Sequence, residues 1–151
     1  MKFDLPAQGG CNCGRVRYVL RAQPLTCYIC HCHLCQKRTG SPYSMSLVCP
    51  TGAAEFTAGQ PEAASRTLPS GAVSTFWSCP QCHSRLWSER TDRPGQGLRA
   101  GTLDDTSKVR PVAQIWVSSA QPWAVVPGIL SYDEQTADPG PMLAAWQALT
   151  T

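Results

Sequence analysis

The sequence CYICHCHLCQKRTGS occupies residues 27–41 and places four cysteines and two histidines within its first nine positions. Cys30, Cys32 and Cys35 combine a C-x-C spacing with a C-x-x-C spacing, so their sulfur atoms can converge on one tetrahedral metal ion. Zinc suits such thiolates, and a catalytic zinc keeps three protein ligands with the fourth position open. The stretch therefore predicts a zinc site whose fourth position is free for water or substrate.

A closed structural site is the alternative interpretation of the same residues. His31, His33 or Cys27 could supply a fourth ligand, and structural zinc sites in proteins have four protein ligands. The local sequence alone favours this closed site, so the choice depends on the cysteines elsewhere in the chain.

Two more cysteine pairs lie outside this stretch. Cys11 and Cys13 stand among the glycines of GGCNCG, which let the backbone bend so that both sulfur atoms face one point. Cys79 and Cys82 form the C-x-x-C of CPQC, a spacing typical of metal ligands. The two pairs make a complete four-cysteine set, for which we predict a closed, structural zinc site.

A zinc ribbon is the rival pairing. It would join the last two cysteines of residues 27–41 to the CPQC pair, but the intervening segment is longer than the ~15–20 residues usual for a ribbon. It would also leave the first cysteine pair without partners. One closed and one open site, with two zinc ions per chain, therefore account better for the spacing. Cys27 and Cys49 are predicted to be ordinary buried thiols.

Length and composition favour a single zinc-binding domain over residues 1–151. Charged residues make up 15% of the chain, below the roughly 25% typical of soluble domains, and 13 Pro and 12 Gly indicate many short strands and turns. The net charge of +3 comes from basic residues that form no long run, which argues against a nucleic-acid partner. No apolar segment reaches the roughly 18 residues of a membrane span, so we expect no membrane partner.

The cysteines also indicate a cellular compartment. The N-terminal residues MKFDLPAQGG have an acid and a proline where the apolar core of a signal peptide would lie. In a reducing compartment, clustered C-x-C and C-x-x-C pairs more often bind a metal than form disulfides. The chain also has nine cysteines, and an odd number cannot all pair in disulfides. We therefore expect a cytoplasmic protein.

Alternating apolar residues and turn signals predict a mainly β structure. We expect strands over residues 15–21, 43–49, 53–59, 63–68, 73–78, 85–89, 98–103 and 112–117. A turn-rich segment is expected over 91–97, and Trp116, Pro122 and Trp123 are expected to cap the hydrophobic core. A short helix is expected near the C-terminus. Its apolar face carries Met142, Leu143, Trp146 and Leu149.

Five blocks of the sequence, taken in order, resemble the glutathione-dependent formaldehyde-activating enzymes, a family that includes the relatives of centromere protein V. The blocks are GCNCG with VRY (10–18), CHCHLCQK with GS (30–41), CPQC with Ser84 and Leu86 (79–86), GTLDD (101–105), and WVSS with PW (116–123). The resemblance spans about residues 9–123, and an ordered set of this kind is specific.

The resemblance implies a fold of antiparallel sheets built around zinc, described as a β-tent. It also implies the metal ligands that the spacing predicts. These are a structural zinc on Cys11, Cys13, Cys79 and Cys82, and a second zinc on Cys30, Cys32 and Cys35. In the family's proposed chemistry, glutathione and formaldehyde combine to S-hydroxymethylglutathione, which is a carbon–sulfur lyase reaction run in reverse.

Two residues depart from the family pattern. His83 follows the second cysteine of CPQC, where the family usually has glycine, and Gln114 precedes Ile115-Trp116, where the family often has histidine. Neither residue is a predicted zinc ligand, so both zinc sites are still expected.

The leading hypothesis is a zinc-dependent carbon–sulfur lyase. A thiol substrate such as glutathione would bind the open position of the zinc on Cys30, Cys32 and Cys35 and add to a carbonyl such as formaldehyde. Three thiolates give this zinc a net negative charge, and the neighbouring Lys37 and Arg38 could attract an anionic thiol.

His31 and His33 are candidates for a general base, or for hydrogen-bonding partners that orient the thiolates. The alternative function is a non-catalytic zinc module whose sheet surface binds a protein, and thiol redox chemistry or metal storage is a third. A fourth ligand supplied to the central zinc by the protein would favour the binding module.

Overall fold

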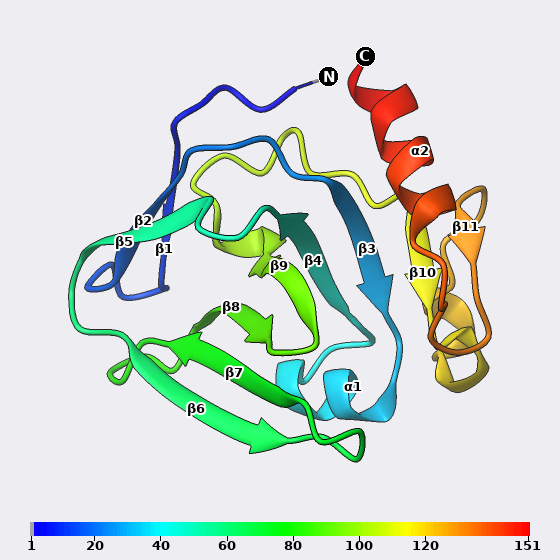
Figure 1. Cartoon of the computed structure of the whole chain (residues 1–151), viewed down its shortest axis with the longest axis horizontal. Coiled ribbons are helices and arrows are strands. Elements are labelled where there is room, and N and C mark those ends of the chain that lie inside the picture. The colour runs from blue at the N-terminus through cyan, green and yellow to red at the C-terminus, as the bar shows by residue number, and fades with distance from the viewer. Residues whose placement is uncertain (1) are drawn as a thin grey trace.

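The computed structural model describes residues 2–151 as a mainly β structure with two α-helices (Figure 1). The strands of the larger sheet are β3 (Thr26–Cys30), β4 (Ser44–Cys49), β6 (Glu62–Thr67), β7 (Val73–Ser78), β8 (Arg85–Arg90), β9 (Arg93–Arg99), β10 (Ala113–Ile115) and β11 (Leu130–Ser131). Those of the smaller sheet are β1 (Ala7–Gly10), β2 (Arg17–Leu20) and β5 (Ala54–Ala58). The mainly β class is therefore as predicted.

The helical elements are short. The two α-helices are α1 (His33–Thr39) and α2 (Gly140–Thr150), and three single 3₁₀ turns are η1 (Ala100–Thr102), η2 (Val117–Ser119) and η3 (Pro122–Ala124). Within residues 2–151, neither α-helix combines the length and the apolar character that crossing a bilayer requires.

The larger sheet curves around α1. Its strand order is β11-β10-β3-β4-β9-β8-β7-β6, and neighbours are antiparallel except at β10, which runs parallel to both β3 and β11. Figure 1 shows α1 inside the arc that runs from β3 to β7. Arg38 of α1 lies over the Phe76 ring of β7, 4.7 Å from its centroid, so the helix reaches across the concave face of the sheet.

The smaller sheet joins the larger one through an aromatic cluster. Tyr18 of β2 is fully buried and meets the edge of Trp87 at 5.7 Å between ring centroids, while Phe56 stacks on Trp87 at 4.1 Å. Such aromatic pairs add about 0.5–1.5 kcal/mol each beyond the burial of their area. Gly9 passes so close to Tyr18 that a Cβ atom there would lie 2.4 Å from the ring, so this contact needs glycine.

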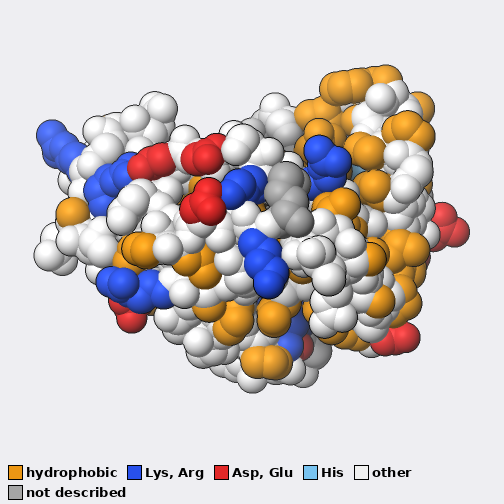
Figure 2. All heavy atoms as spheres, turned by 90° about the horizontal axis from the view of Figure 1, so that it is seen from above, with side chains coloured by type: hydrophobic (Ala, Val, Ile, Leu, Met, Phe, Trp, Pro, Cys, Tyr) orange, Lys and Arg blue, Asp and Glu red, His pale blue; other side chains and the backbone are white. Residues whose placement is uncertain are grey.

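Helix α2 covers one end of the larger sheet, as the apolar pattern of the C-terminal residues predicts. Met142 and Trp146 are buried, the Trp146 indole N–H donates to the carbonyl of Pro24 at 2.8 Å, and the Thr26 hydroxyl donates to the carbonyl of Met142 at 3.1 Å. Figure 2 shows hydrophobic side chains gathered at the right-hand end of the molecule, where α2, β10 and β11 lie in Figure 1. Charged side chains of both signs are scattered over the left of that view.

Residues 91–97 do not form the expected turn-rich segment, because β9 occupies Arg93–Arg99. The glycines that suggested turns serve strand packing instead. A Cβ atom at Gly95 would lie 2.9 Å from the Cys49 carbonyl oxygen, and one at Gly97 would lie 3.1 Å from Ser88 Oγ. These glycines therefore let β9 fit between β4 and β8.

The strand expected over 98–103 is also wrong beyond its first two residues. The chain turns through η1, where the Thr102 hydroxyl donates to the carbonyl of Arg99 at 2.7 Å. The strand expected over 112–117 is limited to β10, since Trp116 adopts a left-handed conformation with φ of 57°.

Trp123 does not cap the hydrophobic core, contrary to the expectation for Trp116, Pro122 and Trp123. Trp123 is 76% exposed, Pro122 is exposed, and Trp116 is half-buried. Pro122 and Trp123 lie in η3, whose one buried residue is Ala124.

Candidate functional site

Four cysteines meet where the two sheets approach each other. Cys11 and Cys13 lie in the turn between β1 and β2, and Cys79 and Cys82 lie in the turn between β7 and β8. Their four sulfur atoms all lie within 4.8 Å of one another. The structure therefore brings together the four residues for which the sequence predicts a closed site, and this four-cysteine cluster could hold a metal ion.

Hydrogen bonds orient the sulfur atoms of the four-cysteine cluster. The backbone N–H of Val16 points at Cys11 Sγ at 3.3 Å, and Ser84 Oγ lies 3.2 Å from Cys82 Sγ. Hydrogen bonds from the hydroxyl and the backbone N–H of Ser84 lower the pKa of Cys82 to about 5, which favours the thiolate that a metal needs. Ser84 Oγ also accepts from the Asn12 N–H at 3.0 Å, so one serine links both turns.

Three cysteines meet at the start of α1. Cys30 ends β3, Cys32 is the N-cap residue of α1 with its sulfur 3.4 Å from the Cys35 N–H, and Cys35 lies in the first turn of the helix. The three sulfur atoms lie within 4.8 Å of one another. Among residues 2–151, no further His, Cys, Asp or Glu offers a ligand atom at this spacing.

None of the three residues considered as a fourth ligand joins this three-cysteine cluster. Cys27 is fully buried in the hydrophobic core together with Cys49, and burial raises the pKa of both thiols to about 12. His31 is fully buried and hydrogen-bonded to Gln114, whereas His33 is exposed.

Two thiols of the three-cysteine cluster differ in acidity. The neighbouring Cys30 thiol, with Ser44, Cys32 and the charge of Arg99, lowers the pKa of Cys35 to about 5. The nearby Cys35 sulfur, together with burial, raises the pKa of Cys30. Negative charge in the cluster is therefore favoured at Cys35 over Cys30.

A cavity of about 540 Å³ opens beside the three-cysteine cluster, lined by all three cysteines and by side chains of the concave sheet face. Its walls come from α1, β3, β4, β6, β7, β8, β9, β10 and the segment after β10. Five arginines line it: Arg38, Arg66, Arg90, Arg93 and Arg99. A second hollow of about 450 Å³ shares Cys35, Arg38 and Arg99 with it and adds Arg85. We call these two hollows together the arginine pocket.

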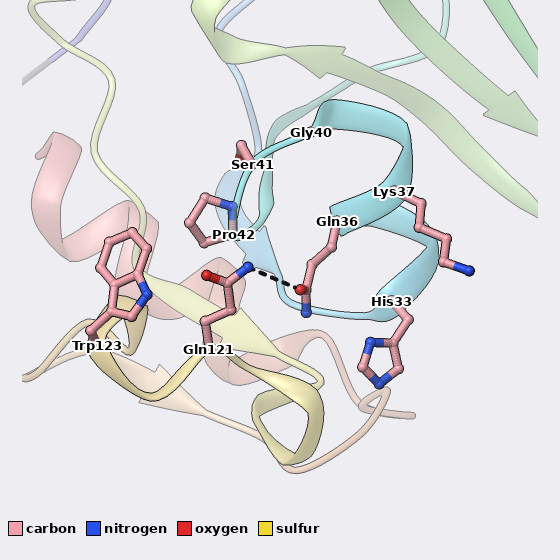
Figure 3. Close-up of a pocket in the computed structure, with 8 residues that line it drawn as sticks. All are labelled: His33, Gln36, Lys37, Gly40, Ser41, Pro42, Gln121 and Trp123. Atoms are coloured by element: carbon pink, nitrogen blue, oxygen red, sulfur yellow. Dashed lines mark hydrogen bonds between the residues drawn. The ribbon is translucent and has the colours of Figure 1, made fainter.

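A separate pocket of about 520 Å³ lies on the other side of α1 (Figure 3). Lys37 lines this pocket and not the arginine pocket, so only Arg38 of the two cations expected beside the three-cysteine cluster lies there. Gln121 donates to Gln36 Oε1 at 3.2 Å, and Gln36 donates to the carbonyls of His31 and Ser119. These bonds anchor the first turn of α1.

The family model of glutathione-dependent formaldehyde-activating enzymes matches residues 6–119, well over half of the chain. The chain belongs to this family. No curated protein matches it. A crystal structure of a Rhodobacter sphaeroides protein, a structural genomics target, resembles it with a TM-score of 0.52 and 16% identity, over 83% of this chain and 98% of that one. At this identity, the likeness shows a shared fold.

Gln114, a departure from the pattern of the formaldehyde-activating family, forms a buried hydrogen bond with His31, which lies between Cys30 and Cys32 in the sequence. Its amide donates to the carbonyl of Val126 at 2.7 Å and to Ser131 Oγ at 2.8 Å, and its Oε1 accepts from the Val126 N–H at 3.0 Å. Oε1 is thus fixed as an acceptor, so His31 Nε2, 3.0 Å away, carries the proton and donates. Buried His31 Nδ1 has no partner in the described chain.

His83, the other departure from the formaldehyde-activating family, has a backbone φ of 62°. This left-handed conformation explains the family's usual glycine, because other residues adopt it at a cost. The His83 N–H donates to the carbonyl of Cys79 at 2.9 Å, which closes the turn that presents both cysteines.

Proposed function

We propose that this chain is a zinc-dependent carbon–sulfur lyase that joins a thiol such as glutathione to a carbonyl compound such as formaldehyde, or reverses that step. The observation that carries the proposal is the three-cysteine cluster, which has no fourth ligand among residues 2–151 and faces the arginine pocket. Membership of the formaldehyde-activating family supports the same chemistry.

The donor set fits zinc at both clusters. Sulfur-only ligands at this spacing favour zinc over hard cations, and four of them close its tetrahedron while three leave one position. We therefore propose two zinc ions per chain, a structural one on Cys11, Cys13, Cys79 and Cys82 and a catalytic one on Cys30, Cys32 and Cys35. When bound, the second zinc would supply a fourth position that favours the thiolate form of a substrate thiol.

The residues around the three-cysteine cluster have separate tasks in this proposal. Ser44 and Arg99 stabilise negative charge at Cys35, as its lowered pKa indicates. The pocket holds the carbonyl compound beside the substrate sulfur. The sulfur lone pair then forms the C–S bond, the π electrons of the carbonyl pass to its oxygen, and that oxygen takes up one proton.

His33 is our candidate for moving that proton. It is exposed and lines the arginine pocket, so it can exchange protons with both solvent and substrate. His31 is fully buried, and its Nε2 proton is committed to Gln114, which suits a supporting role.

X-ray absorption at the zinc edge tests the proposal. With one four-sulfur and one three-sulfur site, the fully loaded protein should average about 3.5 sulfur ligands per zinc, and added glutathione should raise this average to about 4. In Cys30→Ser, the remaining zinc should have four sulfur ligands, and added glutathione should not change that number. An average that glutathione does not raise, either 4 or about 3.5 with one nitrogen ligand at the second zinc, would mean that the protein itself supplies the fourth ligand. The binding-module alternative would then replace this proposal.

Product formation gives a second readout. Nuclear magnetic resonance of glutathione and formaldehyde follows S-hydroxymethylglutathione directly, and the uncatalysed reaction sets the baseline. The unmodified protein should accelerate the approach to equilibrium, whereas Cys30→Ser should match the baseline. Equal rates for the two proteins would remove the catalytic role of the three-cysteine cluster.

A further inference from the structure

Three arginines of the pocket lie in register with one serine across four neighbouring strands. Arg66 of β6 pairs with Ser74 of β7, Ser74 pairs with Arg90 of β8, and Arg90 pairs with Arg93 of β9. All four residues line the same cavity, so three guanidinium groups follow one row of the concave sheet face. Arg90 and Arg93 are paired directly on neighbouring strands, and like charges so placed destabilise a sheet unless a negatively charged partner offsets them.

Carboxylates of the described chain neutralise little of this positive charge. Of the five arginines that line the larger hollow, only Arg90 has a carboxylate within ion-pair distance in residues 2–151, that of Asp92. No aspartate or glutamate of the described chain lines either hollow of the arginine pocket. An anion that enters the pocket therefore meets several unpaired guanidinium groups and no opposing carboxylate.

Arg38 and Arg85 add to this excess beside the three-cysteine cluster. Both lie over the Phe76 ring, at 4.7 and 4.1 Å from its centroid. Burial lowers the pKa of each, and repulsion from the neighbouring arginines lowers it further. Arg85 Nη1 is buried and has no hydrogen-bond partner in residues 2–151. A buried donor of a charged group is unfavourable without a partner, and Arg85 lines the smaller hollow, where an oxyanion can pair with its guanidinium group.

We propose that the arginine pocket binds a dianionic group, and that the substrate of the three-cysteine cluster is a small thiol that carries such a group, as two carboxylates or as a phosphate, without an ammonium group. This inference rests on the proposed function and narrows its substrate class. Arginine binds carboxylates and phosphates through paired N–H donors, so the row of guanidinium groups suits either oxyanion.

The absence of acidic side chains distinguishes this class from glutathione. Glutathione carries an ammonium group beside one of its two carboxylates, and neither hollow offers an aspartate or glutamate of the described chain to receive it. The ammonium group would instead meet repulsion from the arginines. A thiol with the same carboxylates and no ammonium group should therefore bind more tightly.

Isothermal titration calorimetry of the zinc-loaded protein with matched thiols tests the proposal. Charge varies from 2-mercaptoethanol through 3-mercaptopropionate to mercaptosuccinate, and N-acetylglutathione lacks the ammonium group of glutathione. Pantetheine 4′-phosphate against pantetheine separates phosphate from carboxylate recognition. We expect the dissociation constant to fall about tenfold for each added carboxylate, as a charge-assisted hydrogen bond would give. N-acetylglutathione should bind more tightly than glutathione.

Arginine variants locate the binding site. Arg66→Gln and Arg93→Gln should each raise the dissociation constant of mercaptosuccinate about tenfold and leave that of 2-mercaptoethanol unchanged. Both residues are exposed, so neither substitution disturbs the core. Arg110→Gln is the matched control, because Arg110 is exposed and lies outside the arginine pocket. It should change neither constant.

Zinc-edge spectra of the same samples separate the two proposals. If every thiol coordinates zinc with the same affinity whatever its charge, the dianion proposal is wrong and the proposed function stands. If succinate and inorganic phosphate bind in an Arg66-dependent manner but no thiol alters the zinc edge, the proposed function is wrong. The pocket is then an anion site without a thiol substrate.

Discussion

The two cysteine clusters use the same ligand atom but differ in what they connect. The four-cysteine cluster joins the turn at Cys11 and Cys13 to the turn at Cys79 and Cys82, and so ties the smaller sheet to the larger one. The three-cysteine cluster lies within six consecutive residues, from the end of β3 to the first turn of α1, and lines the arginine pocket. A site that joins distant segments of the chain suits a structural role. A site formed by neighbouring cysteines beside a cavity suits substrate binding and catalysis.

This difference has an energetic basis. A metal that closes a long loop removes much of the entropy of the unfolded chain, and binding energy at such a site becomes folding energy. The helix that carries the three-cysteine cluster buries none of its own residues, so little of the core depends on it. Substitutions in the two clusters should therefore differ in how much stability they remove.

Cys79→Ser should have the largest effect. The variant loses a fully buried cysteine of the four-cysteine cluster. If that cluster holds the proposed zinc, we expect the free energy of unfolding to fall by on the order of 5 kcal/mol or more, enough to unfold a domain of this size. Circular dichroism during heating, with zinc measured on the same samples, checks this. A Cys79→Ser protein that melts like the unmodified one would show that the four-cysteine cluster does not hold the fold together.

Gln114→Leu should have the next largest effect, because it removes a buried hydrogen-bonding side chain but no cysteine of either cluster. It leaves His31 Nε2 and both backbone groups of Val126 without their partner, at a cost of about 3 kcal/mol in total. Urea unfolding measures the loss. Gln114→His, which restores the common family residue, should cost less because the ring supplies one donor or acceptor at each nitrogen. If both variants lose the same free energy of unfolding, the shape of the side chain and not its hydrogen bonds determines the loss.

Cys30→Ser should be the mildest of the ligand substitutions. We expect the loss of one zinc per chain and a fall of only about 1 kcal/mol in the free energy of unfolding, since Cys30 lies at the end of β3 and the adjoining α1 contributes no buried residue to the core. Zinc content together with urea unfolding checks both halves of this prediction. A loss as large as that of Cys79→Ser would remove the distinction between a structural and an open site.

Strands of both sheets were predictable where turn residues bound a β-rich run. β4, β5, β6, β7 and β8 lie within one residue of their expected ends for this reason. β9 was missed because Pro94, Gly95 and Gly97 are typical of turns, and only its neighbours explain the glycines. α1 was missed because a seven-residue helix with no buried side chain has no apolar period.

Cysteine spacing predicted which sulfur atoms meet, since each pair or trio is local in sequence and geometry follows from spacing. The arginine pocket was not predictable in this way. Arg66, Arg90 and Arg93 come from three strands, and only the strand register shows that they share a row. Ser84 could have been found from its position two residues after Cys82, but its contact with Asn12 is a tertiary feature.

His83→Gly should have the smallest effect and the opposite sign. A residue with a Cβ atom is strained at a φ of 62°, and glycine relieves this strain, so we expect a gain of about 0.5–1 kcal/mol in the free energy of unfolding. His83→Ala is the matched control, because it removes the imidazole but keeps the strain and should bring no gain. Urea unfolding of the two variants separates conformation from side chain. If both variants change stability equally, the imidazole is responsible, and the backbone of the Cys79–Cys82 turn is not what favours glycine in the family.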